Sequence, residues 1–89
     1  MEKYFFEYTD TYGGEANYTW ADRFLVSAKT LRGALIKVSK ELGLQKALKL
    51  QYNTGDSARW DIKNSCTCLF YRDCYENDIK KYYNLKVID

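Results

Sequence analysis

The residues of this 89-residue chain that could do chemistry are three cysteines and a scattered set of acids. The chain has no histidine, which removes the commonest general base and the usual partner of a cysteine or serine nucleophile. Cys66 and Cys68 lack the second pair that a metal site needs, so we interpret them and Cys74 as reduced, packing thiols. Four acids lie in or next to predicted turns: Asp10, Glu15, Asp56 and Asp61. The sequence therefore predicts no enzyme, no cofactor and no metal site.

The charge of the chain is unevenly spread along the sequence. The net charge is +2, yet residues 1–22 carry five acids and one base, whereas residues 23–50 carry seven bases and one acid. This layout favours electrostatic steering toward a partner, and it argues against a mimic of DNA, which would need an acidic surface. No apolar run approaches the roughly 20 residues of a membrane span, and no signal peptide is recognisable at the start. We therefore expect a cytoplasmic protein with no membrane contact.

The elements that position these charges begin with two strands. Residues 3–9 alternate, with Tyr4, Phe6 and Tyr8 on one face, and residues 17–26 form a second alternating strand. Paired glycines in the stretch 11–15 accept positive φ, which predicts a hairpin turn between the two strands.

One amphipathic helix follows the hairpin. Its apolar stripe recurs at helical spacing and consists of Leu31, Ala34, Leu35, Val38 and Leu42. Ser27 or Thr30 can cap the start, and Gly43 stands where a left-handed residue ends a helix.

Three further strands complete the predicted sheet. Leu48, Leu50 and Tyr52 alternate on one face, and residues 58–62 and 66–72 follow after turn signals. The tail, residues 75–89, fits either a short helix around Ile79, Tyr82 and Tyr83 or an irregular segment. The sequence thus predicts a single α+β domain over residues 1–89, with two layers, an antiparallel β-β-α-β-β-β sheet and one helix on one face.

The candidate binding residues are cations and one aromatic ring. The exposed helix side is basic, which fits either a solvated surface or a patch for an acidic protein or a phosphate backbone. Arg23 and Arg59 point away from the apolar strand faces, toward the open side of the sheet, where they could pair with Asp61 or contact a partner. Tyr12, in the first turn, is the best candidate for an exposed ring. The predicted partner-binding residues are Tyr12, Arg23, Lys29, Arg32, Lys37, Lys40 and Arg59.

The first hairpin carries a resemblance. The stretch YTDTYGGEANYTW at residues 8–20, followed by Arg23, is similar to the opening of small phage and mobile-element proteins of undefined function. Those proteins continue with a similar helix, a turn like Gly55-Asp56 and an aromatic strand like residues 66–71. Small phage proteins of this build often serve as anti-defence factors, including anti-CRISPR proteins, which inhibit a host nuclease complex by stoichiometric contact. The resemblance transfers no role to any single residue.

Two functions are therefore expected from the sequence. The first is a phage-encoded anti-defence protein, an anti-CRISPR, that binds a host CRISPR-Cas effector in the host cytoplasm. The alternative is a small accessory protein that binds nucleic acid through the basic helix face and exposed aromatic rings. The sequence does not decide whether the chain forms a homodimer.

Overall fold

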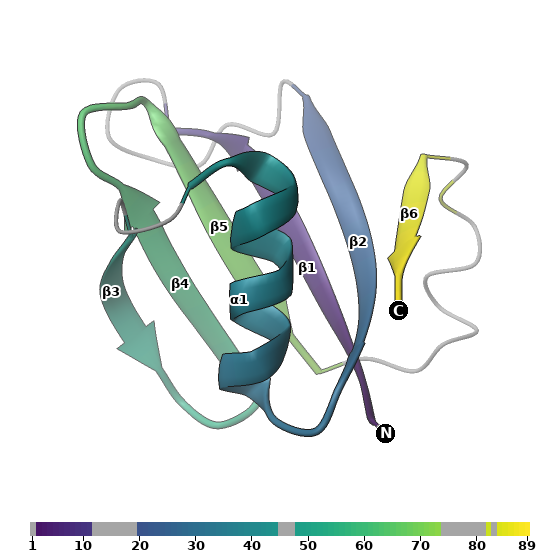
Figure 1. Cartoon of the computed structure of the whole chain (residues 1–89). Helices are drawn as coiled ribbons and strands as arrows, with labels where there is room; N and C mark the ends of the chain where they lie inside the picture. The colour runs from purple at the N-terminus through teal and green to yellow at the C-terminus, as the bar shows by residue number, and fades with distance from the viewer. Residues whose placement is uncertain (1, 12–19, 45–47, 74–81, 83) are drawn as a thin grey trace.

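The first strand of the chain lies inside the sheet, between the second strand and the fifth. The computed structural model describes residues 2–11, 20–44, 48–73, 82 and 84–89 (Figure 1). Its elements are β1 (Glu2–Asp10), β2 (Ala21–Ala28), α1 (Leu31–Leu42), β3 (Leu48–Asn53), β4 (Ser57–Ile62), β5 (Thr67–Arg72) and β6 (Leu85–Ile88). The strand order across the sheet is β3-β4-β5-β1-β2-β6. The predicted α+β class, with one helix on one face of a sheet, is confirmed.

The tail departs from the sequence prediction. Residues 85–88 form a sixth strand that pairs in parallel with β2, so the sheet is mixed rather than wholly antiparallel. Of the two alternatives for the tail, the short helix is not matched: Tyr82 is not helical, and Ile79 and Tyr83 lie outside the described residues. A strand of only four residues gives too weak a periodic signal to be recognised, and its stability comes from pairing with the free edge of β2.

The hairpin of β1 and β2 follows the predicted alternation. Phe6 lies opposite Phe24 and Tyr4 opposite Val26, and all four are buried under the helix. These rings and branched chains supply the apolar surface that a domain of this size needs. The predicted turn at 11–15, including Tyr12, extends beyond the described residues.

The helix has the ends that its sequence predicts. Thr30, rather than Ser27, is the N-cap: its Oγ1 accepts a hydrogen bond from the Gly33 N–H at 3.1 Å. Gly43 ends the helix at φ 70°, in the left-handed region that favours glycine. Ala34 and Val38, from the middle of the apolar stripe, are fully buried in the core.

The opposite face of the sheet is not simply polar. Phe5 and Leu25 are buried there, and Tyr82 and Leu85 pack against them in a second, smaller apolar cluster. The Phe5 and Tyr82 rings stack with their centroids 6.0 Å apart. The face that the helix leaves open is therefore partly apolar, and Tyr82 and Leu85 from the tail cover part of it.

An irregularity in β3 corrects one further prediction. Leu50 lies opposite Trp60, but Tyr52 lies opposite Arg59, so Gln51 is an extra residue in the ladder. Such a bulge moves the residues after it to the other face. Leu48 and Leu50 therefore face the helix, whereas Tyr52 shares the opposite face with Arg59 rather than continuing the predicted stripe.

Candidate functional site

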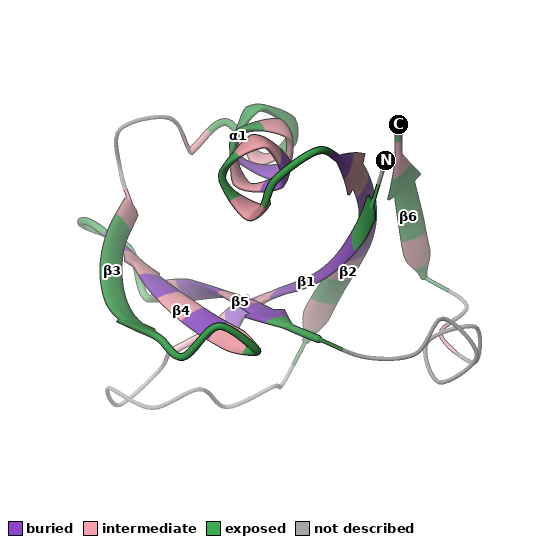
Figure 2. Ribbon diagram, turned by 90° about the horizontal axis from the view of Figure 1, so that it is seen from below, coloured by how far each residue is buried: buried purple, intermediate pink, exposed green. Residues whose placement is uncertain are grey.

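One helix is too narrow to cover this sheet. An α-helix with its side chains is about 10–12 Å across, and strands lie about 4.8 Å apart, so a single helix covers roughly two strands. Among the described elements, α1 packs mainly on β2 and also on β1. Figure 2 shows the helix on one side of the sheet, with β3 set apart from it and curling toward the same side. The side chains between α1 and the β3–β4 pair are therefore left partly uncovered.

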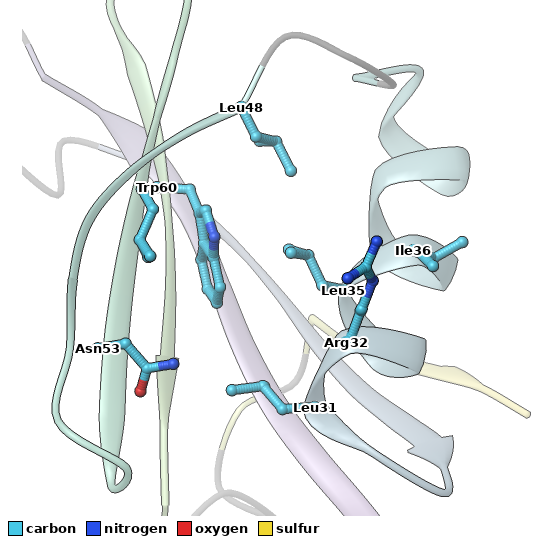
Figure 3. Close-up of a pocket in the computed structure, with 8 residues that line it drawn as sticks. Leu31, Arg32, Leu35, Ile36, Leu48, Asn53 and Trp60 are labelled. Carbon is cyan, nitrogen blue, oxygen red and sulfur yellow. The ribbon is translucent and has the colours of Figure 1, made fainter.

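A groove lies between the helix and this uncovered part of the sheet. Its volume is about 640 Å³. The lining residues from the helix are Leu31, Arg32, Leu35 and Ile36, and those from the sheet are Leu48, Leu50, Asn53 and Trp60 (Figure 3). We call this feature the α1–β3 groove.

The α1–β3 groove is apolar, and its rims are exposed. Trp60, only 7% exposed, forms part of its wall, whereas Ile36 on the helix is 48% exposed and Leu50 on the strand 53%. Among the described lining residues, none is acidic and Arg32 is the one charge. Figure 3 shows Leu31 and Leu35 pointing from the helix toward the sheet, whereas Ile36 points away from it. An open groove lined mainly by large apolar side chains is typical of a binding surface.

The cations predicted to form a basic patch on the helix do not all have the same role. Arg32, Ile36 and Lys40 are four residues apart in turn, so they form one row along the helix, and both cations are exposed. Lys37 has a different role, because its Nζ donates a 2.6 Å hydrogen bond to the Ser27 carbonyl oxygen and is only half-exposed. Lys29 is exposed in the turn before the helix. Of the predicted cations, Arg32 lines the groove and Lys40 continues its row.

Arg23 has partners within the chain. Its Nε donates to Glu7 Oε2 at 3.2 Å, and its guanidinium lies 4.0 Å from the centroid of the Tyr82 ring. Arg72 Nε lies 3.3 Å from the other oxygen of the same carboxylate. Because Glu7 is buried, these two cations stabilise a charge that would otherwise be costly. The geometry gives Arg23 a structural role.

Arg59 also has a partner on the face away from the helix. Its Nε donates a 2.8 Å hydrogen bond to Asp61 Oδ1, and this bond raises the pKa of the Arg59 guanidinium. The guanidinium also lies 5.4 Å from the centroid of the Phe70 ring. Of the two roles that the sequence left open, Arg59 has the pairing with Asp61. Arg59 lies on the opposite side of the sheet from the groove.

The two described cysteines differ in environment: Cys68 is a packing thiol, as predicted, whereas the prediction is wrong for Cys66, which is exposed. Cys68 is fully buried, and burial raises the pKa of its thiol to about 11, which keeps it protonated at neutral pH. Cys66 is exposed, and Cys74 and Tyr12 lie outside the described residues. Within the described ranges, no three His, Cys, Asp or Glu side chains are gathered so as to hold a metal ion.

Sequence reasoning missed the groove because it did not identify Ile36 and Leu50 as exposed. One signal was present: Ile36 lies off the apolar stripe, between Arg32 and Lys40 on a face that is otherwise basic. A single exposed isoleucine is common on protein surfaces, so this signal alone does not predict a groove.

The described helix is too short and too polar to cross a membrane. Comparison of the chain with protein-family models, with curated proteins and with solved structures finds no match.

Proposed function

We propose that this chain is a binding protein that acts by stoichiometric contact with a protein partner, and that the α1–β3 groove is its contact surface. The observation that carries the proposal is the pair of exposed apolar rims, Ile36 and Leu50, beside the exposed cation Arg32. Covering such rims adds apolar burial that the domain itself does not achieve, at about 25 cal/mol per Å². The basic row favours a partner with an acidic surface.

The biological role that we propose for this contact is anti-defence, and in particular inhibition of a host CRISPR-Cas nuclease complex in the host cytoplasm. The support is the resemblance of the first hairpin to small phage and mobile-element proteins, together with the small size of the domain. An apolar groove with a basic rim fits an inhibitor that covers a protein surface, and it does not fit a mimic of DNA.

Nucleic acid is the less favoured partner. Lys37 is held by the Ser27 carbonyl, which reduces the exposed cations of the helix region to Lys29, Arg32 and Lys40. Three cations form a small footprint for a phosphate backbone, and the apolar groove has no role in phosphate binding.

Site-specific photo-crosslinking in the host cell tests the contact surface. The photoreactive residue p-benzoylphenylalanine replaces Ile36 in one variant and Val87, a matched exposed apolar residue on β6 at the other edge of the sheet, in the control. We expect a discrete protein adduct from position 36 and none from position 87. Equal labelling from the two positions, or adducts with nucleic acid alone, would contradict the proposal.

The anti-defence role has its own test. A phage targeted by the host CRISPR system is plated on cells that produce the wild-type chain, the Ile36→Glu/Leu50→Glu variant or the Val87→Glu control. We expect plating to rise with the wild type and the control, and not with the groove variant. If plating stays unchanged on hosts of every CRISPR type tested, the anti-CRISPR assignment is wrong, whatever the crosslinks show.

A further inference from the structure

We infer that the partner contributes an extended segment that pairs with β3 as an added strand and places alternate apolar side chains in the α1–β3 groove. The segment is acidic between its apolar residues. This inference rests on the proposed function and specifies how the same surface is used.

The first support is the position of β3 in the sheet. β3 is an edge strand, and among the described elements its one strand partner is β4. Five of its six residues are exposed, from Lys49 to Asn53. The outer backbone groups of such an edge are a ready template for another extended chain, and several domain types recognise peptides in this way.

The second support is the register between this edge and the groove. Side chains of neighbouring strands point to the same face at paired positions, and each strand alternates between faces. Leu48 and Leu50 point toward the helix, so an added strand would direct every second side chain to the helix side as well. Figure 2 shows the sheet curling at β3 toward the side that carries α1, which brings an added strand over the mouth of the groove. Leu31 and Leu35, which point from the helix toward the sheet in Figure 3, would then lie across from those side chains.

Charge specifies the remaining residues of the segment. Arg32 lines the groove and Lys40 continues its row on the helix, while Lys49 is exposed on β3 itself. No described residue that lines the groove is acidic, so Arg32 has no acid beside it there. Lys49 lies opposite Asp61 in the β3–β4 ladder, on the face away from the helix. The residues between the apolar ones point away from the helix, to the face where Lys49 lies, so Asp or Glu at these positions complements Lys49 on β3 rather than the cations of the helix.

A second copy of this chain is the less suitable occupant. Pairing β3 with its own copy would bring two Lys49 side chains into one short ladder, and like charges that lie opposite each other are destabilising. The bulge at Gln51 also interrupts the regular edge after three residues. Lysine and bulges on an edge strand are devices that limit self-pairing, and they leave a short stretch for a specific partner.

The experiment begins with a displayed library of random peptides of about ten residues, a length that spans the β3 edge. Peptides are selected on the wild-type chain and counter-selected on the Ile36→Glu/Leu50→Glu variant. We expect the enriched sequences to alternate apolar residues with Asp or Glu. An enriched peptide is then added to the labelled protein, and hydrogen exchange of the amides at 48–53 is followed by nuclear magnetic resonance. Added-strand pairing slows the exchange of the outward-facing amides.

Backbone methylation of the peptide provides a matched control. Methylating the alternate peptide amides that point toward β3 should weaken binding by about tenfold or more, whereas methylating the other alternate set should change it by less than about threefold. Apolar residues enriched at helical spacing, or bound peptides that leave the exchange at 48–53 unchanged, would overturn the added-strand inference while the groove remained a binding site.

Two other results would separate this inference from the proposed function. If no peptide depends on the groove but the crosslink from position 36 appears, the partner presents a folded surface and the inference is wrong. If sedimentation shows a dimer of the wild-type chain that the groove variant dissociates, a second copy is the occupant and the inference is again wrong.

Discussion

The two halves of the helix-bearing face contain the same kinds of residue in different states. Under α1, on β1 and β2, Phe6 and Val26 are fully buried, whereas on β3 the side chain of Leu50 is 53% exposed. All three strands present apolar side chains to the same side of the sheet, so residue type does not decide which of these side chains are buried. The width of the helix decides their burial, because a single helix covers about two strands of the sheet. Partial coverage therefore leaves part of the apolar surface of this face exposed.

The largest expected effect is on the covered half. Phe6→Ala should lower the free energy of unfolding by about 3–5 kcal/mol, because it removes a fully buried ring from a close-packed core. Leu50→Ala, on the uncovered half, should change it by about 0.5 kcal/mol or less. Urea unfolding of both variants measures the difference. Equal losses would mean that Leu50 is covered in solution, and the contrast between the two halves would fail.

The second effect compares two ion pairs on the face of the sheet away from the helix: one has a buried carboxylate and the other an exposed carboxylate. Glu7→Gln should cost about 1–3 kcal/mol, because the buried carboxylate accepts from Arg23 and lies beside Arg72. Asp61→Asn, at a carboxylate whose side chain is 38% exposed, should cost less than about 1 kcal/mol. Both are measured by thermal unfolding, with the cost of Asp61→Asn shrinking further at high salt. A larger loss at Asp61 than at Glu7 would reverse our ranking of the two sites.

A third, smaller effect concerns the helix that forms one wall of the groove. Gly43→Ala should lower stability by about 1 kcal/mol, because position 43 has φ 70° and a side chain there strains the backbone. A Cβ at this position meets no other atom within 4 Å, so the loss comes from the backbone alone. Gly43→Asn should recover part of it, since asparagine tolerates this conformation better. Denaturant unfolding of the two variants tests the order.

The smallest effect at neutral pH is a difference in thiol reactivity. At about pH 8 a maleimide should modify Cys66 and leave Cys68 intact, because the pKa of the buried Cys68 thiol is about 11. The folded chain also holds this proton more tightly than the unfolded chain, so stability should fall as the pH rises above the ordinary value of 9 and through about 11. Mass spectrometry of the labelled peptides gives the first readout. A Cys68→Ala variant, which should show a shallower decline, controls the second.

Much of the fold was predictable because its signals are local. The apolar stripe, Thr30 and Gly43 define the helix within a few residues, and five strands follow from alternation between turn signals. The sixth strand and the bulge at Gln51 were not predictable in this way. Neither contains a glycine or proline that would mark it, and both arise from pairing with a neighbouring strand.

The candidate site was predictable only in part. Arg32 and Lys40 lie at or beside the groove, as a basic helix face suggests, but Lys37, Arg23 and Arg59 have partners within the chain. Those partners depend on strand register and on how the helix sits on the sheet, which no local pattern encodes. The groove itself depends on which strands the helix leaves uncovered.

The place of β1 at the centre of the sheet has a kinetic consequence. Its pairing with β2 joins nearby parts of the chain, but its pairing with β5 joins Phe6 to Tyr71, far along the sequence. Contacts of such separation slow folding, because a long loop must close before they form. We therefore expect the pairing of β5, and with it the β3–β4–β5 meander, with β1 to limit the folding rate. The transition state is then reached when β1 and β5 pair.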